Sequence, residues 1–340
     1  MCAVSKKTRG CKLPNALATM VMSGAVGLAY FNCDPMIAGS EPTQRMANLD
    51  IQPVMALPPL PQAPVPAPVE PGAEPVDGAP ESQTVAAYDD GVLRGKWALQ
   101  MNTLMLQRGV ERFRDIDSYK FTLTRQERVG GDLLPPQVMD VKLRHAPFSL
   151  YMKWLAGEGA GVKGRQLLFV EGQNDDKLII LPGGLAGRLT GALELSLDDP
   201  LVTAEARHPA NECGLLRLAE TVLGHHVKDL EHGCHGVQCE FHDNQVFNER
   251  PCYLFMATYE SPERSPTYRK VAMYIDKELS MPICINNYTW GNDIPPEELD
   301  QLTLVEAYSY SDITIDTREA SLTEDDWNRD NSKYRMRKKK

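Results

Sequence analysis

The sequence lacks the short catalytic motifs by which many enzymes are recognised. It contains no Gly-x-Ser-x-Gly nucleophile elbow, no His-Glu-x-x-His helix and no glycine-rich phosphate loop, which argues against the hydrolase, zinc-protease and nucleotide chemistry of those motifs. Two pairs of adjacent carboxylates, Asp198-Asp199 and Glu297-Glu298, stand beside prolines and therefore indicate helix starts rather than acid–base pairs. The sequence predicts a protein that is not an enzyme and that uses no cofactor.

Basic residues are in short supply. The chain has 36 Lys and Arg against 46 Asp and Glu, a net charge of -10. Basic side chains are dense only in the tail, residues 335–340. An acidic domain repels phosphate backbones, so nucleic acid is not an expected partner. The basic tail is either a solvated terminus or a contact for an anionic membrane surface.

A hydrophobic run long enough to span a membrane is also missing. The apolar stretch at residues 16–31 is shorter than the roughly 20 residues that a spanning helix needs. Four basic residues precede it: Lys6, Lys7, Arg9 and Lys12. This pattern predicts an export signal over residues 1–40 with cleavage near Ser40, and a retained membrane anchor or lipidation at Cys33 are the alternatives. The protein is expected in the periplasm or at a membrane of the cell envelope.

Proline is concentrated directly after this leader. Ten of the 25 prolines lie between Pro53 and Pro80, where they favour an extended, solvated chain that cannot bury a core. Residues 41–88 are therefore predicted to be a disordered linker, rather than a docking site for a proline-binding module. Residues 89–334 remain for one folded domain.

The reactive side chains of the domain gather in one segment, residues 225–242, which is rich in histidine and cysteine. Zinc prefers such ligands, and the weak metal candidates are His232, Cys234, His235 and Cys239. Their spacing differs from that of familiar zinc sites, so ordinary loop and core residues are favoured over a metal site. A disulfide between Cys234 and Cys239 is a further alternative, and five domain cysteines leave at least one thiol unpaired.

Apolar residues recur at helical spacing near the start of the domain. Leu93, Trp97, Met101, Leu104 and Met105 form a stripe that continues toward residue 113, and this spacing predicts an amphipathic helix that turns the stripe toward the core. A second helix is predicted over residues 215–230. Ser321 and Glu324 have the spacing of a capping box, which predicts a short helix over residues 321–327.

Most of the domain shows the pattern of short β-strands separated by turns. The predicted strands cover residues 119–124, 138–145, 148–155, 166–171, 178–181, 252–259, 269–276, 283–290 and 302–315. Such an arrangement is typical of an antiparallel meander. Residues 252–259 and 271–275 are apolar on both faces of their strands. Both faces are therefore covered, or one of them lines a hydrophobic cavity.

The order of these elements, together with several short stretches, resembles a known group of proteins. The stretches are Tyr119-x-Phe121-x-Leu123, Arg144-His145-Ala146-Pro147-Phe148, Tyr274-Ile275-Asp276-Lys277 and Asp326-Trp327-Asn328. They resemble an uncharacterised family of exported bacterial proteins, a domain of unknown function. That family in turn is similar to the LolA/LolB superfamily of lipoprotein carriers.

The resemblance implies an α+β fold, in which a curved antiparallel sheet forms an unclosed half β-barrel with helices on its concave side. In the carriers this cavity holds acyl chains, so a lipid or a lipidated protein is the implied partner. No functional residue of the carriers matches a position of this sequence. The candidate cavity-lining residues are Phe121, Tyr151, Trp154, Phe169, Phe255, Tyr274 and Trp290.

The leading hypothesis is an exported, non-enzymatic protein that binds a lipid or lipoprotein in the cell envelope. The first alternative is an envelope scaffold or protein-interaction module without a cavity. The second is a metal- or thiol-dependent enzyme that uses the Cys/His segment at residues 225–242. An apolar void between sheet and helices would favour the leading hypothesis, a lipid-binding protein, over the scaffold.

Overall fold

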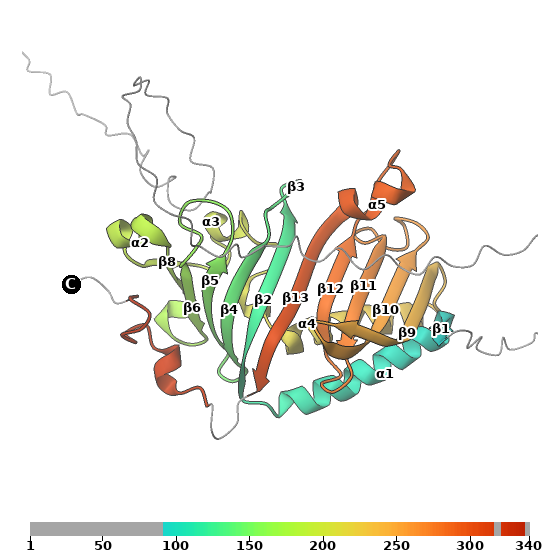
Figure 1. The fold of residues 1–340 in the computed structure, drawn as a ribbon, viewed down its shortest axis with the longest axis horizontal. Helices are drawn as coiled ribbons and strands as arrows, with labels where there is room; N and C mark the ends of the chain where they lie inside the picture. Colours follow the sequence, from blue (N-terminus) through green and yellow to red (C-terminus); the bar gives the residue numbers. More distant parts are fainter. Residues whose placement is uncertain (1–90, 316–320, 337–340) are drawn as a thin grey trace, which may run out of the picture.

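The computed structural model describes residues 91–315 and 321–336 (Figure 1). The predicted leader, the predicted proline-rich linker and the last four residues of the basic tail lie outside the described residues.

The described residues form one antiparallel sheet in the order β1-β9-β10-β11-β12-β13-β2-β4-β5-β6-β7-β8, with β3 paired to β2. The strands are β1 Val92–Arg94, β2 Ser118–Val129, β3 Asp132–Leu133, β4 Gln137–Arg144, β5 Ser149–Ala156, β6 Gln166–Val170, β7 Leu178–Leu181, β8 Leu193–Leu195, β9 Val237–Phe247, β10 Arg250–Tyr259, β11 Lys270–Asp276, β12 Pro282–Tyr288 and β13 Leu304–Ile315. Since β1 and β8 do not pair with each other, the sheet is not closed, as the resemblance to the carriers implies.

Five α-helices accompany the sheet. They are α1 Gly95–Arg114, α2 Gly184–Thr190, α3 Pro200–Thr203, α4 Leu215–Glu231 and α5 Pro296–Thr303. Asp199 caps α3 by accepting a hydrogen bond from Leu201, and Glu297 and Glu298 lie in the first turn of α5. The adjacent carboxylates thus begin helices, as their prolines predicted.

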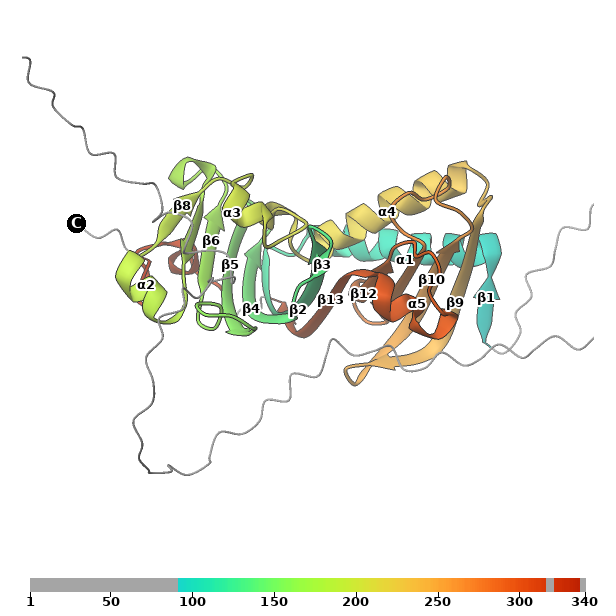
Figure 2. The same cartoon turned by 90° about the horizontal axis from the view of Figure 1, so that it is seen from above.

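The helices α1 and α4 pack together on one face of the half-sheet β9–β12 (Figure 2). Their inner side chains, among them Leu99, Leu106 and Val222, form a core with Phe255, Met273 and other strand residues. Seen from above, the sheet is bowed, and α3 and α4 lie on its concave side. The α+β fold with a curved antiparallel sheet is therefore confirmed.

The opposite face of the sheet is also covered. The C-terminal segment packs Trp327, Tyr334 and Met336 against β5–β7, where the rings of Tyr151 and Tyr334 stack at 3.9 Å. Near the turn between β9 and β10, Phe247 stacks on Tyr274 at 5.1 Å. This second cover explains why several strands are apolar on both faces.

Three local predictions need correction. The stripe formed by Trp97, Met101 and Leu104 faces solvent, because the inner face of α1 is set by other residues. Residues 237–247 form a full strand, β9, which polar side chains concealed in the sequence pattern. The short C-terminal helix is a 3-10 turn, Glu324–Trp327, whose capping box uses Thr323 and Asp326 rather than Ser321 and Glu324.

Candidate functional site

A cavity of about 380 Å³ lies between the concave face of the sheet and the segment that carries α3 and α4. Strands β2, β5, β6 and β7 supply one part of its wall, and β10–β13 supply another. Its volume falls in the range of roughly 300–1,000 Å³ that small-molecule sites occupy. The sheet is curved, and helices α1 and α4 pack on only one half of its concave face. Space therefore remains beside them on the concave face.

Two groups of apolar side chains line the cavity. One group belongs to β2, β5–β7 and α3 and consists of Leu123, Met152, Leu167, Ile180, Leu201 and Val202. The other belongs to α4 and β10–β12 and consists of Leu218, Val222, Phe255, Ala257, Val271 and Ile285. Alternation along the strands places the strand residues of both groups on one face of the sheet. With the residues from α3 and α4, they make much of the cavity wall hydrophobic.

A buried carboxylate, Glu306 on β13, is the centre of a polar cluster in the wall. It accepts hydrogen bonds from Asn287 at 2.7 Å and from Tyr268 at 2.7 Å, and His208 lies at 2.9 Å from it. Burial by itself would raise the pKa of Glu306, but its bonds with His208, Asn287 and Tyr268 outweigh burial and hold the pKa at about 2. Glu306 is thus an ionised, fully bonded structural group near neutral pH.

A second buried carboxylate, Glu127 on β2, lies beside this cluster. It accepts a 2.5 Å hydrogen bond from the hydroxyl of Tyr308, and the backbone N–H of Arg207 donates to it at 3.2 Å. The guanidinium of Arg207 donates to Glu306 at 3.1 Å. The two carboxylates thus have protein donors, as buried charges require.

The segment at residues 199–213, here called the cover segment, closes one side of the cavity. Its contacts with the sheet include several charged ones. Glu205 pairs with Arg165, which lies near the ring of Trp154, and Arg207 and His208 pair with Glu306. Leu201 and Val202 add apolar contacts from its inner side. The cover segment is therefore held largely by ion pairs at its middle.

Two of the predicted lining residues, Trp154 and Phe255, contribute to the cavity wall. Phe121 and Phe169 lie on the same face of the sheet but are buried in the core next to the cavity, against Tyr310 and Phe148 respectively. Whether any of these residues contacts a ligand stays a prediction.

The other three predicted lining residues lie elsewhere. Tyr151 and Tyr274 are on the opposite face of the sheet, where they stack on Tyr334 and Phe247. Trp290 follows β12 and donates a 2.8 Å hydrogen bond to the carbonyl of Ser265. A strand that is apolar on both faces does not reveal which face is concave, so the sequence could not separate these positions.

Sequence reasoning missed the polar half of the site, above all Glu127, Glu306 and His208. A signal was present for Glu306, which interrupts the predicted strand at residues 302–315, whereas Glu127 lies beyond the predicted strand at residues 119–124. Charged residues are seldom fully buried unless they are paired. The sequence did not show that β2 and β13 are neighbours, with Glu127 opposite Glu306.

The Cys/His segment does not gather into a metal site among the described residues, where no group of three His, Cys, Asp or Glu side chains is suitably placed. His232 bonds the Lys228 carbonyl at the end of α4, and His235 is exposed. Cys239 is buried in β9, where burial raises the pKa of its thiol to about 12. Cys234 and Cys239 are both free thiols, so the alternative of a disulfide between them is wrong.

None of the helices in the described residues is long and apolar enough to cross a membrane. A comparison with curated proteins finds no match. Solved structures with a similar fold include a putative outer membrane lipoprotein-sorting protein domain from Vibrio parahaemolyticus, with 12% identity over 68% of this chain and 97% of that chain and a TM-score of 0.31.

Two further solved structures are similar at the same low level. Lipoprotein LppX from Mycobacterium tuberculosis has 10% identity over 64% of this chain and 99% of that chain, with a TM-score of 0.35. A LolA superfamily protein from Nitrosomonas europaea has 14% identity over 67% of this chain and 97% of that chain, with a TM-score of 0.26.

A family model matches residues 116–336, well over half of the chain. The match covers the sheet from β2 to β13, the cover segment, and the C-terminal segment that packs on the convex face. It confirms the predicted relationship to a domain of unknown function. The chain belongs to the family described as Protein of unknown function (DUF1571).

Proposed function

We propose that this chain is an exported, non-enzymatic protein that binds the acyl chain of a lipid or of a lipidated protein in the cavity beneath the cover segment. The observation that carries the proposal is the apolar void of about 380 Å³ on the concave face. Burial of an acyl chain contributes ~0.8 kcal/mol per methylene group. A chain of ordinary length can therefore be held by apolar walls alone.

The polar cluster supports a binding role rather than a catalytic one. The carboxylate of Glu306 is already bonded to Asn287, Tyr268 and His208. A general base works best when its pKa lies near the working pH, whereas the pKa of Glu306 is about 2. The cluster is better suited to fixing the cover segment on the sheet than to moving protons.

The first test is the identity of what the protein carries. Full-length protein purified from its own host is analysed by native mass spectrometry, and its extracted lipids are identified. We expect a co-purifying lipid or lipidated peptide. If no lipid is found, and a fluorescent probe such as dansyl-undecanoic acid does not bind, the proposal fails and an interaction module without a ligand becomes the better account.

The second test fills the cavity. Val202 lies on α3 and lines the cavity, so Val202→Trp should place a large side chain in the void and weaken dansyl-undecanoic acid binding by roughly tenfold or more. The matched control is Val246→Trp, because Val246 is 66% exposed on β9 and does not line the cavity. Equal loss of affinity in both variants would remove the cavity from the explanation.

A further inference from the structure

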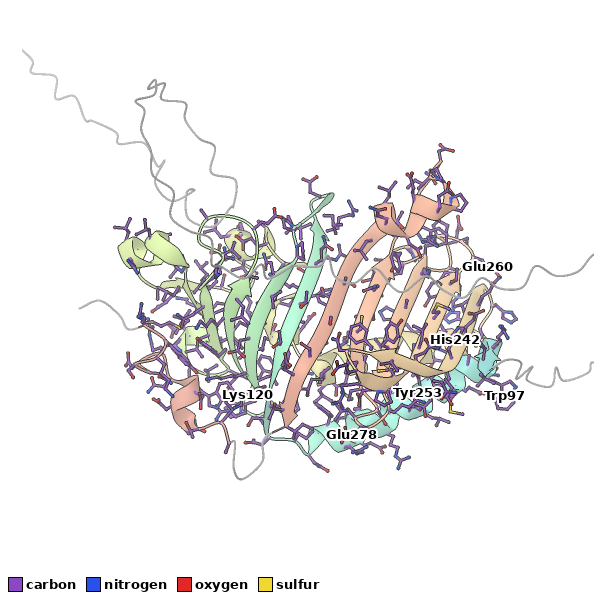
Figure 3. All side chains as sticks on the ribbon, in the orientation of Figure 1. Trp97, Lys120, His242, Tyr253, Glu260 and Glu278 are labelled. Carbon is purple, nitrogen blue, oxygen red and sulfur yellow. The ribbon has the colours of Figure 1, made fainter. Side chains whose placement is uncertain are left out.

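The outer face of α1 carries an exposed apolar stripe. Trp97, Met101 and Leu104 are 57%, 43% and 63% exposed. Their spacing of four and then three residues places them in one line along the helix. Figure 3 shows Trp97 at the outer edge of the molecule, near the N-terminal end of α1. Large side chains on a soluble surface are common singly, but a line of three on one helix face is a candidate contact surface.

The stripe cannot be turned into the core, because the inner face of α1 is already packed. Leu99, Leu106 and Phe113 are almost fully buried on that face. Gly109 lies so close to the turn after β11 that a Cβ at this position would be 2.1 Å from the carbonyl oxygen of Ser280. The helix is thus fixed in its rotation, and its apolar outer face is a stable feature of the surface.

Basic side chains flank the stripe. The helix Gly95–Arg114 contains Lys96, Arg108, Arg112 and Arg114 but only one acidic residue, Glu111, in a chain whose net charge is -10. Arg114 pairs with Glu220 and Arg112 donates to the Glu278 carbonyl. Lys96 and Arg108 are exposed and have no carboxylate partner within the part of the chain that the structure describes. This combination of an apolar stripe and free cations is typical of helices that lie in a membrane interface.

We propose that the outer face of α1 binds the surface of a membrane with anionic head groups, with Trp97, Met101 and Leu104 in the interface and Lys96 and Arg108 against the head groups. Charge favours this occupant over a second copy of the chain. Two copies of α1 placed face to face would bring cations against cations, which is repulsive. The proposal concerns a site other than the cavity, and it does not require that the cavity binds lipid.

Brominated lipids test the position of Trp97 directly. The full chain is mixed with phosphatidylglycerol vesicles whose acyl chains carry bromine, which quenches tryptophan at contact. We expect wild-type fluorescence to contain a quenched component that Trp97→Phe lacks. Wild type and Trp97→Phe share the predicted leader, so any membrane binding by the leader is common to both proteins. The leader adds no tryptophan signal, because the four tryptophans of the chain lie at positions 97, 154, 290 and 327.

Charge variants test the head-group contact. Lys96→Gln combined with Arg108→Gln should weaken binding to phosphatidylglycerol vesicles by roughly 30-fold. Each cation near an anionic surface contributes ~1 kcal/mol to binding, and the double variant removes two. The matched control is Lys153→Gln combined with Lys163→Gln, which removes two exposed cations far from α1 in the sequence and should change affinity little. The difference should shrink in high salt.

Two results would overturn the proposal. One is quenching that is equal in wild type and Trp97→Phe. The other is that the charge variants leave vesicle binding intact but change the oligomeric state in sedimentation, which would identify a protein partner. Trp154 lies in the cavity wall, so a quenched component that only Trp154→Phe removes reports cavity loading instead. Failure of membrane docking and failure of lipid binding are therefore distinguishable.

Discussion

At the scale of single residues, the carboxylate of Glu306 is hydrogen-bonded to residues from three separate parts of the chain. It lies on β13, its neighbours Asn287 and Tyr268 belong to β12 and the segment before β11, and His208 belongs to the cover segment. A buried charge in an otherwise apolar sheet is tolerated only with such a set of donors. Glu306 therefore determines where the cover segment rests.

The contact between His208 and Glu306 predicts a pH dependence. The bond to Glu306 raises the pKa of His208 above its usual 6.5, although burial opposes this. A raised pKa adds stability that is complete below about pH 6.5 and is lost as the pH rises through the raised value. Glu306, whose pKa falls from 4.5 to about 2, adds stability above about pH 4.5 that is lost as the pH falls toward 2. The cover segment should be held best between these limits.

Hydrogen exchange of the cover segment measures this effect. After correction for intrinsic rates, protection of residues 199–213 should fall as the pH rises from about 6 to about 8, and His208→Gln should abolish this fall. Because the side chain of His208 is 44% exposed, the effect should stay below about 1 kcal/mol. An identical pH profile in wild type and His208→Gln would contradict the assignment.

At the scale of single elements, helix α1 has an inner face that packs in the core and an outer face that is exposed. Its inner face packs on α4 and β9, and its outer face carries the stripe that we assign to a membrane surface. The sequence pattern predicts that Trp97, Met101 and Leu104 face the core, yet the fixed rotation of the helix places them outside. Small residues on the inner face, such as Ala98 and Gly109, allow the close approach that sets this rotation.

Gly109→Ala tests the close approach of α1. Alanine normally stabilises a helix interior by about 1 kcal/mol relative to glycine. At Gly109 its Cβ would meet the Ser280 carbonyl at 2.1 Å, so we expect a net loss of stability of about 1–3 kcal/mol in urea unfolding. The control is Gly224→Ala in α4, where a Cβ meets nothing within 4 Å and a gain is expected. A gain at both sites would refute the tight contact.

At the scale of the whole molecule, one continuous sheet has covers on both faces. The helices α1 and α4 cover the concave face of β9–β12, and the C-terminal segment covers the convex face of β5–β7. The cavity lies on the concave face between the two halves, with walls from β2 and β5–β7 on one side and from α4 and β10–β13 on the other. Strands β13 and β2 connect the two halves through an extended antiparallel pairing from Glu306–Glu127 to Ile315–Tyr119.

Removal of Trp327 tests the convex cover. Its ring is 3% exposed and lies 5.2 Å from the guanidinium of Arg144. We expect Trp327→Ala to lower the free energy of unfolding by about 3–5 kcal/mol, with one transition, since the sheet is continuous. Trp97→Ala is the matched control and should cost below about 1 kcal/mol, because Trp97 is exposed. A small loss in Trp327→Ala would mean that the C-terminal segment is not part of the core.

Much of the fold could be predicted because periodicity is a local property. Strand β2 was predicted from the alternation at Tyr119, Phe121 and Leu123, and strand β7 from the apolar run Leu178–Leu181. Strand β9 was missed because its exposed side chains and its Cys/His content resembled a loop. The cavity was anticipated from strands with two apolar faces, but only Trp154 and Phe255 among the named residues line it.

The sequence by itself determined which segments become strands and helices, that the sheet is antiparallel, and that both of its faces are largely apolar. Only the tertiary structure decided which face is concave, which side of α1 is buried, and which charges meet at Glu306. The physical reason is that strand and helix periods act over a few neighbouring residues. Sheet curvature, helix rotation and the pairing of Glu306 on β13 with His208 in the cover segment depend on contacts between residues far apart in the chain.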